Sequence, residues 1–257
     1  MTTDLRAPST GPGRRTVGEE VSGLIRRREY ADAEAVLLDR LTEHPGPVAT
    51  ACRGLTSDWV EIVDWETVAA ALGRASAQRQ GVTAIGLDLS NFSDADGFEW
   101  WDKEPVVEYA LYDDSYFPFS TATRRQVQQA AAEHPAPWTG HRLAGPHGTM
   151  GVRGLRSLNG ALLRNEAGRP WDFGPDGRSY DDDVAMLLGG WWLVLQFHQA
   201  IARDWPEVGP VLGVPVLVGQ HGTGPWQVSV FAPTDAAAPD PGDRHRAQSA
   251  GPARAGA

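Results

Sequence analysis

The sequence predicts an α+β fold in which a mixed or antiparallel sheet packs against helices and follows an N-terminal helical hairpin. Short β-branched and apolar runs bounded by Gly and Pro predict strands near 82–89, 105–112, 211–218 and 226–231. Apolar residues at helical spacing predict helices near 64–79, 121–134 and 184–204. The 257 residues, 41% hydrophobic and 22% charged, are enough to bury a substantial core.

Composition divides the chain into four parts. Residues 1–16 and 235–257 are rich in small residues, Pro and Gly and show no periodicity. We therefore expect a disordered N-terminal segment and a disordered C-terminal tail. Residues 17–45 are expected to form the helical hairpin. Residues 56–234 are expected to form the main α+β domain.

The hairpin carries a pattern of its own. In the stretch REYADAEAVLLDRLTEHP, Ala33 and Leu37 recur at helical spacing, and Pro45 stands at the end of the second helix. This stretch resembles one hairpin of the tetratricopeptide type, which uses that spacing on its second helix. A second copy does not follow, and such repeats generally need about three units to be stable. We therefore expect this hairpin to dock on the main domain, and we infer no partner from it.

The most apolar stretch is predicted to be a buried central helix that ends at Pro206. Apolar residues cover nearly every face of 184–195, and an acidic triplet at 181–183 suits a helix start. This run is short for a bilayer span and contains two glycines. The N-terminus lacks the apolar run of a secretory signal, and Cys52 is the only cysteine. The sequence therefore predicts a cytoplasmic protein without a membrane partner.

The acidic residues are concentrated in one stretch. Residues 58–114 contain thirteen Asp and Glu against three basic residues, so their net charge of −10 equals that of the whole chain. A local field of this kind can steer a basic partner or a cation. A solvated acidic face that keeps the protein soluble would show the same composition. The sequence pI of 5.1 argues against a nucleic-acid partner, because phosphate contacts need a basic face.

The connection between the first two predicted strands is too long for a tight hairpin and carries both acids and aromatics. Its adjacent tryptophans would face opposite ways in an extended segment, so one ring can pack inward while the other faces out. A tryptophan framed by carboxylates suits a partner rich in Arg or Lys. The alternative is that both rings pack beneath the loop. The predicted binding residues are Asp94, Asp96, Glu99, Trp100, Trp101, Asp102 and Glu104.

Two loops share the pattern Gly-x-His-Gly-Thr, at 145–149 and 219–223. If these loops converge, His147 and His221 with a carboxylate such as Asp94 or Asp172 could perform general-base chemistry. Turn formation is the simpler explanation of a short repeat in a glycine-rich chain.

Neither a cofactor nor a metal site is predicted. An EF-type calcium loop around Gly97 fails, because Phe92 and Lys103 stand where oxygen ligands are required. His198 is expected to be a core histidine, and Cys52 a small buried thiol.

These patterns favour a cytosolic binding or regulatory protein, such as an inhibitor or immunity-type antagonist, that presents its acidic tryptophan loop to a basic protein. The alternatives are a small-molecule enzyme that uses His147 and His221, and a structural assembly subunit. The sequence leaves the identity of the partner and the oligomeric state open.

Overall fold

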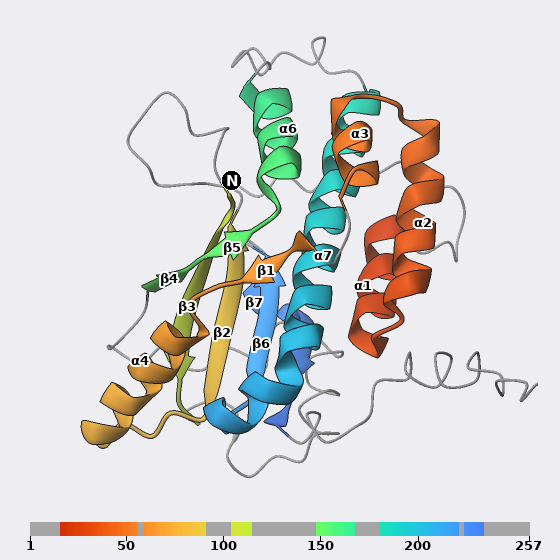
Figure 1. Ribbon diagram of the computed structural model, residues 1–257. Coiled ribbons are helices and arrows are strands. Elements are labelled where there is room, and N and C mark those ends of the chain that lie inside the picture. The colour runs from red at the N-terminus through yellow and green to blue at the C-terminus, as the bar shows by residue number, and fades with distance from the viewer. Residues whose placement is uncertain are drawn as a thin grey trace, which may run out of the picture.

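A five-stranded sheet and one long helix form the centre of the molecule (Figure 1). The computed structural model describes residues 16–55, 59–90, 104–114, 148–167, 180–220 and 224–233. The helices are α1 (Val17–Arg27), α2 (Tyr30–Glu43), α3 (Pro47–Arg53), α4 (Trp65–Ala77), α6 (Arg156–Ala167) and α7 (Tyr180–Leu212). The strands are β1 (Glu61–Ile62), β2 (Ala84–Ser90), β3 (Val106–Tyr112), β4 (Gly148–Met150), β5 (Val152–Arg153), β6 (Val216–Gln220) and β7 (Gly224–Phe231).

The main sheet is mixed, and its strand order is β4-β3-β2-β6-β7. Strands β2 and β6 run parallel, whereas the other neighbours are antiparallel. A separate two-stranded sheet joins β1 to β5. Together with the N-terminal helices, this arrangement confirms the predicted α+β fold.

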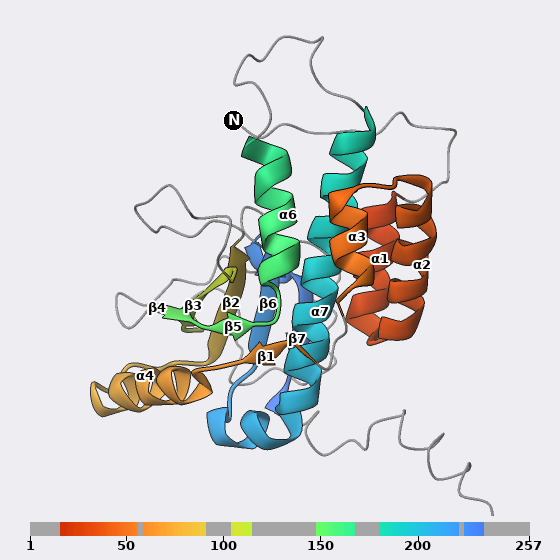
Figure 2. The ribbon, with the colours of Figure 1, turned by 45° about the horizontal axis from the view of Figure 1, so that its top comes forward.

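Helix α7 lies across one face of the sheet; α1, α2, α3 and α6 pack beside it, whereas α4 projects away from it (Figures 1 and 2). Side chains alternate along β2, so Ile85, Leu87 and Leu89 point toward this helical layer, where they join the hydrophobic core. Phe231 of β7 shares that face, and its ring contacts Trp205 of α7. Residues 188–201 are almost all buried, which confirms the predicted central helix.

The N-terminal hairpin forms as predicted and packs against α7, and α1 also reaches β7. Thr16 and Glu19 form a capping box at the start of α1. The sequence predicts a break between the two helices near 30–32, but the break falls at Arg28 and Glu29, because Arg28 adopts the left-handed conformation that ends α1. Pro47 occupies the first turn of α3, a short helix that the sequence did not predict.

The prediction that α7 ends at Pro206 was wrong, as was the prediction that a strand begins at Val211. The helix continues through Pro206 and Pro210 to Leu212. A proline removes a backbone donor and disfavours a helical residue before it. Here the flanking turns are held by packing, because Trp205 and Leu212 are buried. Tertiary contacts therefore override the local preference.

By length and composition alone, residues 184–212 of α7 could cross a membrane, but 67% of the apolar window is buried inside the protein. That burial is typical of a core helix. The predicted helix at 121–134, the residues before Thr16 and those of the predicted tail lie outside the described residues.

Candidate functional site

Two parallel strands direct their following loops to the same end of the sheet. In the register of β2 and β6, Leu89 is paired with Gln220, so both strands finish there. The antiparallel partner of β2 begins at that end, because Ser90 is paired with Val106. The register therefore brings the two ends of the predicted acidic loop next to each other on central strands. We call this end of the sheet, with Asp88, Glu104 and Glu108, the acidic end.

Most of the predicted binding residues are not among the residues that the structure describes. Residues 91–103 fall outside the described part of the chain, and they include Asp94, Asp96, Glu99, Trp100, Trp101 and Asp102. Only Glu104 of the predicted set is described. The interpretation of this loop as a binding site therefore stays a prediction.

Glu104 has a specific structural position at the start of α6. Its two carboxylate oxygens accept hydrogen bonds from the backbone N–H groups of Gly154 and Leu155, at 2.9 and 2.8 Å. A carboxylate stabilises the unpaired N–H groups and the positive end of the dipole at a helix N-terminus. Gly154 is required here, because its φ is +93° and a Cβ would clash with the carbonyl oxygen of Trp59. Glu104 thereby ties the end of the acidic loop to α6.

Two carboxylates that the sequence analysis did not single out face each other on the sheet. Asp88 of β2 and Glu108 of β3 are directly paired in the register, and both are half-buried. Directly opposite side chains have Cβ atoms about 5 Å apart, and like charges in this position are destabilising. Asp88 and Glu108 lie on the face opposite Leu87, at the same end as Glu104. The sequence signal was an acid inside each of two otherwise apolar strands.

The two histidine loops attach to strands that are well separated. His147, His221 and Asp172 lie outside the described residues, as does Asp94. The neighbouring residues Gly148 and Gln220 belong to β4 and β6, which have β3 and β2 between them. Three strand spacings amount to about 14 Å. The described strands therefore give no support to a shared histidine site, and that alternative stays a prediction.

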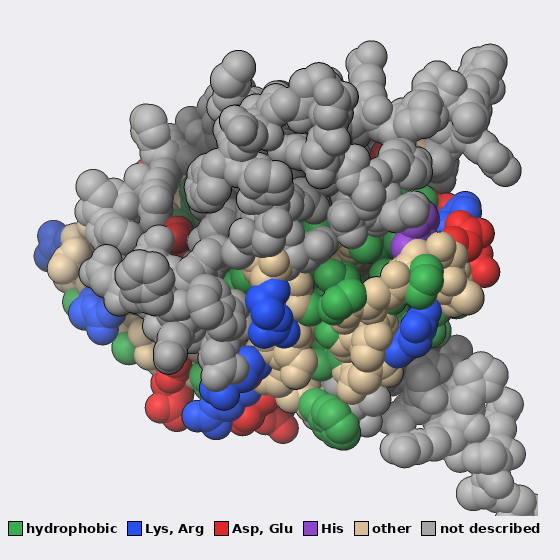
Figure 3. Space-filling view, turned by 90° about the horizontal axis from the view of Figure 1, so that it is seen from above, with side chains coloured by type: hydrophobic (Ala, Val, Ile, Leu, Met, Phe, Trp, Pro, Cys, Tyr) green, Lys and Arg blue, Asp and Glu red, His purple; other side chains and the backbone are tan. Residues whose placement is uncertain are grey.

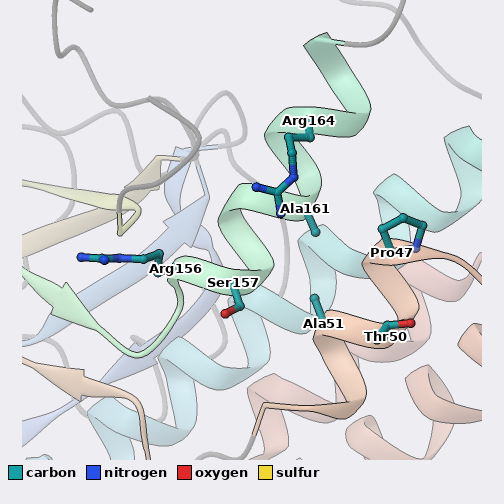
Figure 4. A pocket seen from close by; sticks show the side chains of 7 residues that line it. All are labelled: Pro47, Thr50, Ala51, Arg156, Ser157, Ala161 and Arg164. Carbon is teal, nitrogen blue, oxygen red and sulfur yellow. The ribbon is translucent and has the colours of Figure 1, made fainter. Parts of the chain in front are cut away.

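A surface groove lies between α3 and α6 (Figure 4). It has a volume of about 540 Å³, and its lining residues are Pro47, Thr50, Ala51, Arg156, Ser157, Ala161 and Arg164. Figure 4 shows Arg156 extending away from α3, whereas Arg164 lies along α6. The two guanidinium groups do not converge on one point, so the groove has no defined anion site.

Two titratable side chains are buried in the helical layer. Burial raises the pKa of the Cys52 thiol to about 12, which suppresses the reactive thiolate. Burial also lowers the pKa of His198 to about 4, so its ring is neutral near pH 7. Both residues lie in the core, as the sequence predicted.

The described residues offer no metal centre. Nowhere in the described ranges do three or more His, Cys, Asp or Glu side chains group in a way that could hold a metal ion. On the part of the surface that Figure 3 colours by type, basic side chains lie both near the middle and at the edge, where acidic side chains also lie. Comparison with protein-family models, curated protein sequences and solved structures found no match to this chain.

Proposed function

We propose that this protein is a cytosolic binding or regulatory protein whose acidic end engages a basic protein partner. The observation that carries the proposal is the direct pairing of Asp88 with Glu108 beside the attachment points of the acidic loop. Opposed like charges cost stability, and such costs are tolerated most often where function needs them. An inhibitor or an immunity-type antagonist would use a surface of this kind.

Charge distribution supports the same conclusion. Residues 58–114 carry a net charge of −10, and the rest of the chain is neutral. Because β2 and β3 are antiparallel neighbours, the acids between them are attached at one end of the sheet. A concentrated field raises the rate of encounter with a basic partner and makes binding sensitive to salt.

The test uses an arginine-rich peptide as the probe and an acidic peptide of equal length as its negative control. We expect the affinity for the arginine-rich peptide to fall at least about tenfold between about 50 mM and about 500 mM salt, because screening weakens charge pairing between exposed groups. Binding that is insensitive to salt, or equal binding of the acidic peptide, would contradict the proposal.

Paired variants locate the surface. Replacing Trp100 and Trp101 with Ala should weaken binding by about tenfold or more, because a buried aromatic anchor supplies much of an interface's energy. Trp59→Ala is the matched control, since Trp59 is 68% exposed and lies outside the acidic loop. Circular dichroism and thermal unfolding of each variant would verify that the fold is retained. Equal losses in the Trp59 control would place the binding surface elsewhere.

Variants that neutralise acidic side chains separate the effect of local charge on binding from the effect of the net charge of the chain. Asp96→Asn with Asp102→Asn should weaken peptide binding severalfold. Asp32→Asn with Asp39→Asn removes the same charge from exposed positions on α2 and should leave binding nearly unchanged. If both pairs had the same effect, only the net charge of the chain would matter.

A further inference from the structure

A buried histidine lies where α1, α7 and β7 meet. His198 is fully buried on α7, and its Nδ1 donates a hydrogen bond to the carbonyl oxygen of Val194 at 2.7 Å. A carbonyl oxygen can only accept, so the neutral ring carries its proton on Nδ1. Nε2 is buried and has no hydrogen-bond partner within the described residues. The rings of Phe197 and Phe231 lie 6.4 and 6.2 Å from the imidazole ring, between centroids.

The end of α1 completes this junction. Arg28, the residue that ends α1, places its guanidinium carbon 4.9 Å from the centroid of the Phe231 ring. Phe231 therefore contacts a cation from α1 and the imidazole from α7. At its other end, α1 lies against Trp191, because a Cβ at Gly18 would be 3.0 Å from the indole nitrogen. Helix α1 thus docks along α7, with its last residue beside the histidine junction.

Within the described residues, no carboxylate contacts the ring of His198. Arg28 is the charged group that acts on His198 from α1, and it disfavours a second positive charge. The β7 residues Ser229 and Phe231, which share the face toward α7, carry no charge. No hydrogen bond or ion pair joins a described carboxylate to either ring nitrogen. A protonated ring would therefore place an unpaired cation in an apolar site beside a guanidinium.

We propose that His198 is an acid-sensitive latch for α1: protonation of its ring releases the C-terminal end of α1 from β7 while the sheet and α7 remain folded. Arg28 is half-buried, so this end of α1 borders both the junction and solvent, and its movement would admit water to the junction. In the closed state the pKa of His198 is held at about 4, below its ordinary value of 6.5. The open state therefore binds the proton more tightly, and the open population grows as pH falls from about 6.5 toward 4.

The experiment is hydrogen–deuterium exchange of the full chain between about pH 7.5 and pH 4.5, corrected for the intrinsic effect of pH on exchange. We expect the opening constant of residues 17–28 to rise about tenfold per pH unit below pH 6.5, because opening takes up one proton. Residues 84–90 of β2 should keep their protection. Equal loss of protection in both segments would mean global unfolding and would overturn the latch.

A matched pair of variants assigns the proton. His198→Gln cannot titrate, so the opening of 17–28 should lose its pH dependence. His44→Gln removes a histidine from the end of α2 and should behave like the wild type. A His198→Gln protein with the wild-type pH profile would overturn the proposal.

Should His198→Gln fail to fold, the wild type itself gives the answer. The ring signal of His198, followed by NMR, should titrate below pH 5, and the amide signals of α1 should shift with the same midpoint. A titration near the ordinary value of 6.5, or α1 signals that do not follow the ring, would overturn the latch.

Discussion

The two faces of the five-stranded sheet follow different chemistry, although they alternate along the same strands. Toward α7, the positions at Ile85, Leu87 and Leu89 are apolar and fully buried. On the opposite face, the intervening positions of β2 are Gly86 and Asp88, and Asp88 is paired with Glu108 of β3. Both faces bury apolar side chains, since Leu217 and Val230 are buried on the second face, but that face also carries two directly opposed carboxylates, and such opposition costs stability. The comparison indicates that packing was not the only requirement on these two central strands.

The largest effect should come from the helical face. Phe231→Ala removes a ring that is 1% exposed and that contacts Trp205 at a centroid distance of 5.5 Å. The lost burial and the remaining cavity should lower the free energy of unfolding by about 3–5 kcal/mol. Urea denaturation monitored by circular dichroism would measure this loss.

Phe231→Leu serves as the control, because it keeps most of the apolar volume and should cost clearly less than the alanine variant. A loss below about 1 kcal/mol for Phe231→Ala would contradict the tight packing of β7 against α7.

The sequence predicted the elements that depend on local pattern and missed those that depend on distant partners. Predicted strands at 82–89 and 105–112 match β2 and β3 to within about two residues, because apolar runs and bounding Pro and Gly are local signals. The parallel pairing of β2 with β6 could not be predicted, since the two strands are far apart in the chain. The extension of α7 beyond Pro206 is stabilised by the burial of Trp205 and Leu212, which local propensity does not contain.

The same distinction applies to the candidate site. The excess of acids in 58–114 is visible in the sequence, but the position of each acid is not. The pairing of Asp88 with Glu108 depends on the register of two strands joined by a long connection, and no turn signal fixes that register. The bonds from Glu104 to the start of α6 join residues about fifty positions apart. Acid content was therefore predictable, whereas the structural position of each acid was not.

An intermediate effect is expected where the acidic end meets α6. Glu104→Gln replaces one acceptor oxygen by a donor and removes the charge that faces the N–H groups of Gly154 and Leu155. We expect a loss of about 1–2 kcal/mol in the free energy of unfolding, because hydrogen bonds to a charged acceptor are stronger than neutral ones. Chemical denaturation would measure the loss, and amide exchange of 154–158 would locate it.

Glu66→Gln is the matched control for this variant. Glu66 is an exposed acid in the first turn of α4, so its neutralisation should cost only a few tenths of a kcal/mol. Equal losses for the two variants would mean that Glu104 acts only through the general charge of a helix start.

The smallest effect has the opposite sign. Glu108→Gln removes one of two directly opposed carboxylates while keeping nearly the same shape, so it should raise the free energy of unfolding by about 0.2–1 kcal/mol. Asp88→Asn should act in the same direction, and the double variant should gain less than the sum, because the repulsion can be removed only once. The same substitutions should weaken binding of the arginine-rich peptide. A destabilisation by Glu108→Gln of more than about 1 kcal/mol would show that this carboxylate stabilises the sheet, and it would remove the main support for a binding role of the acidic end.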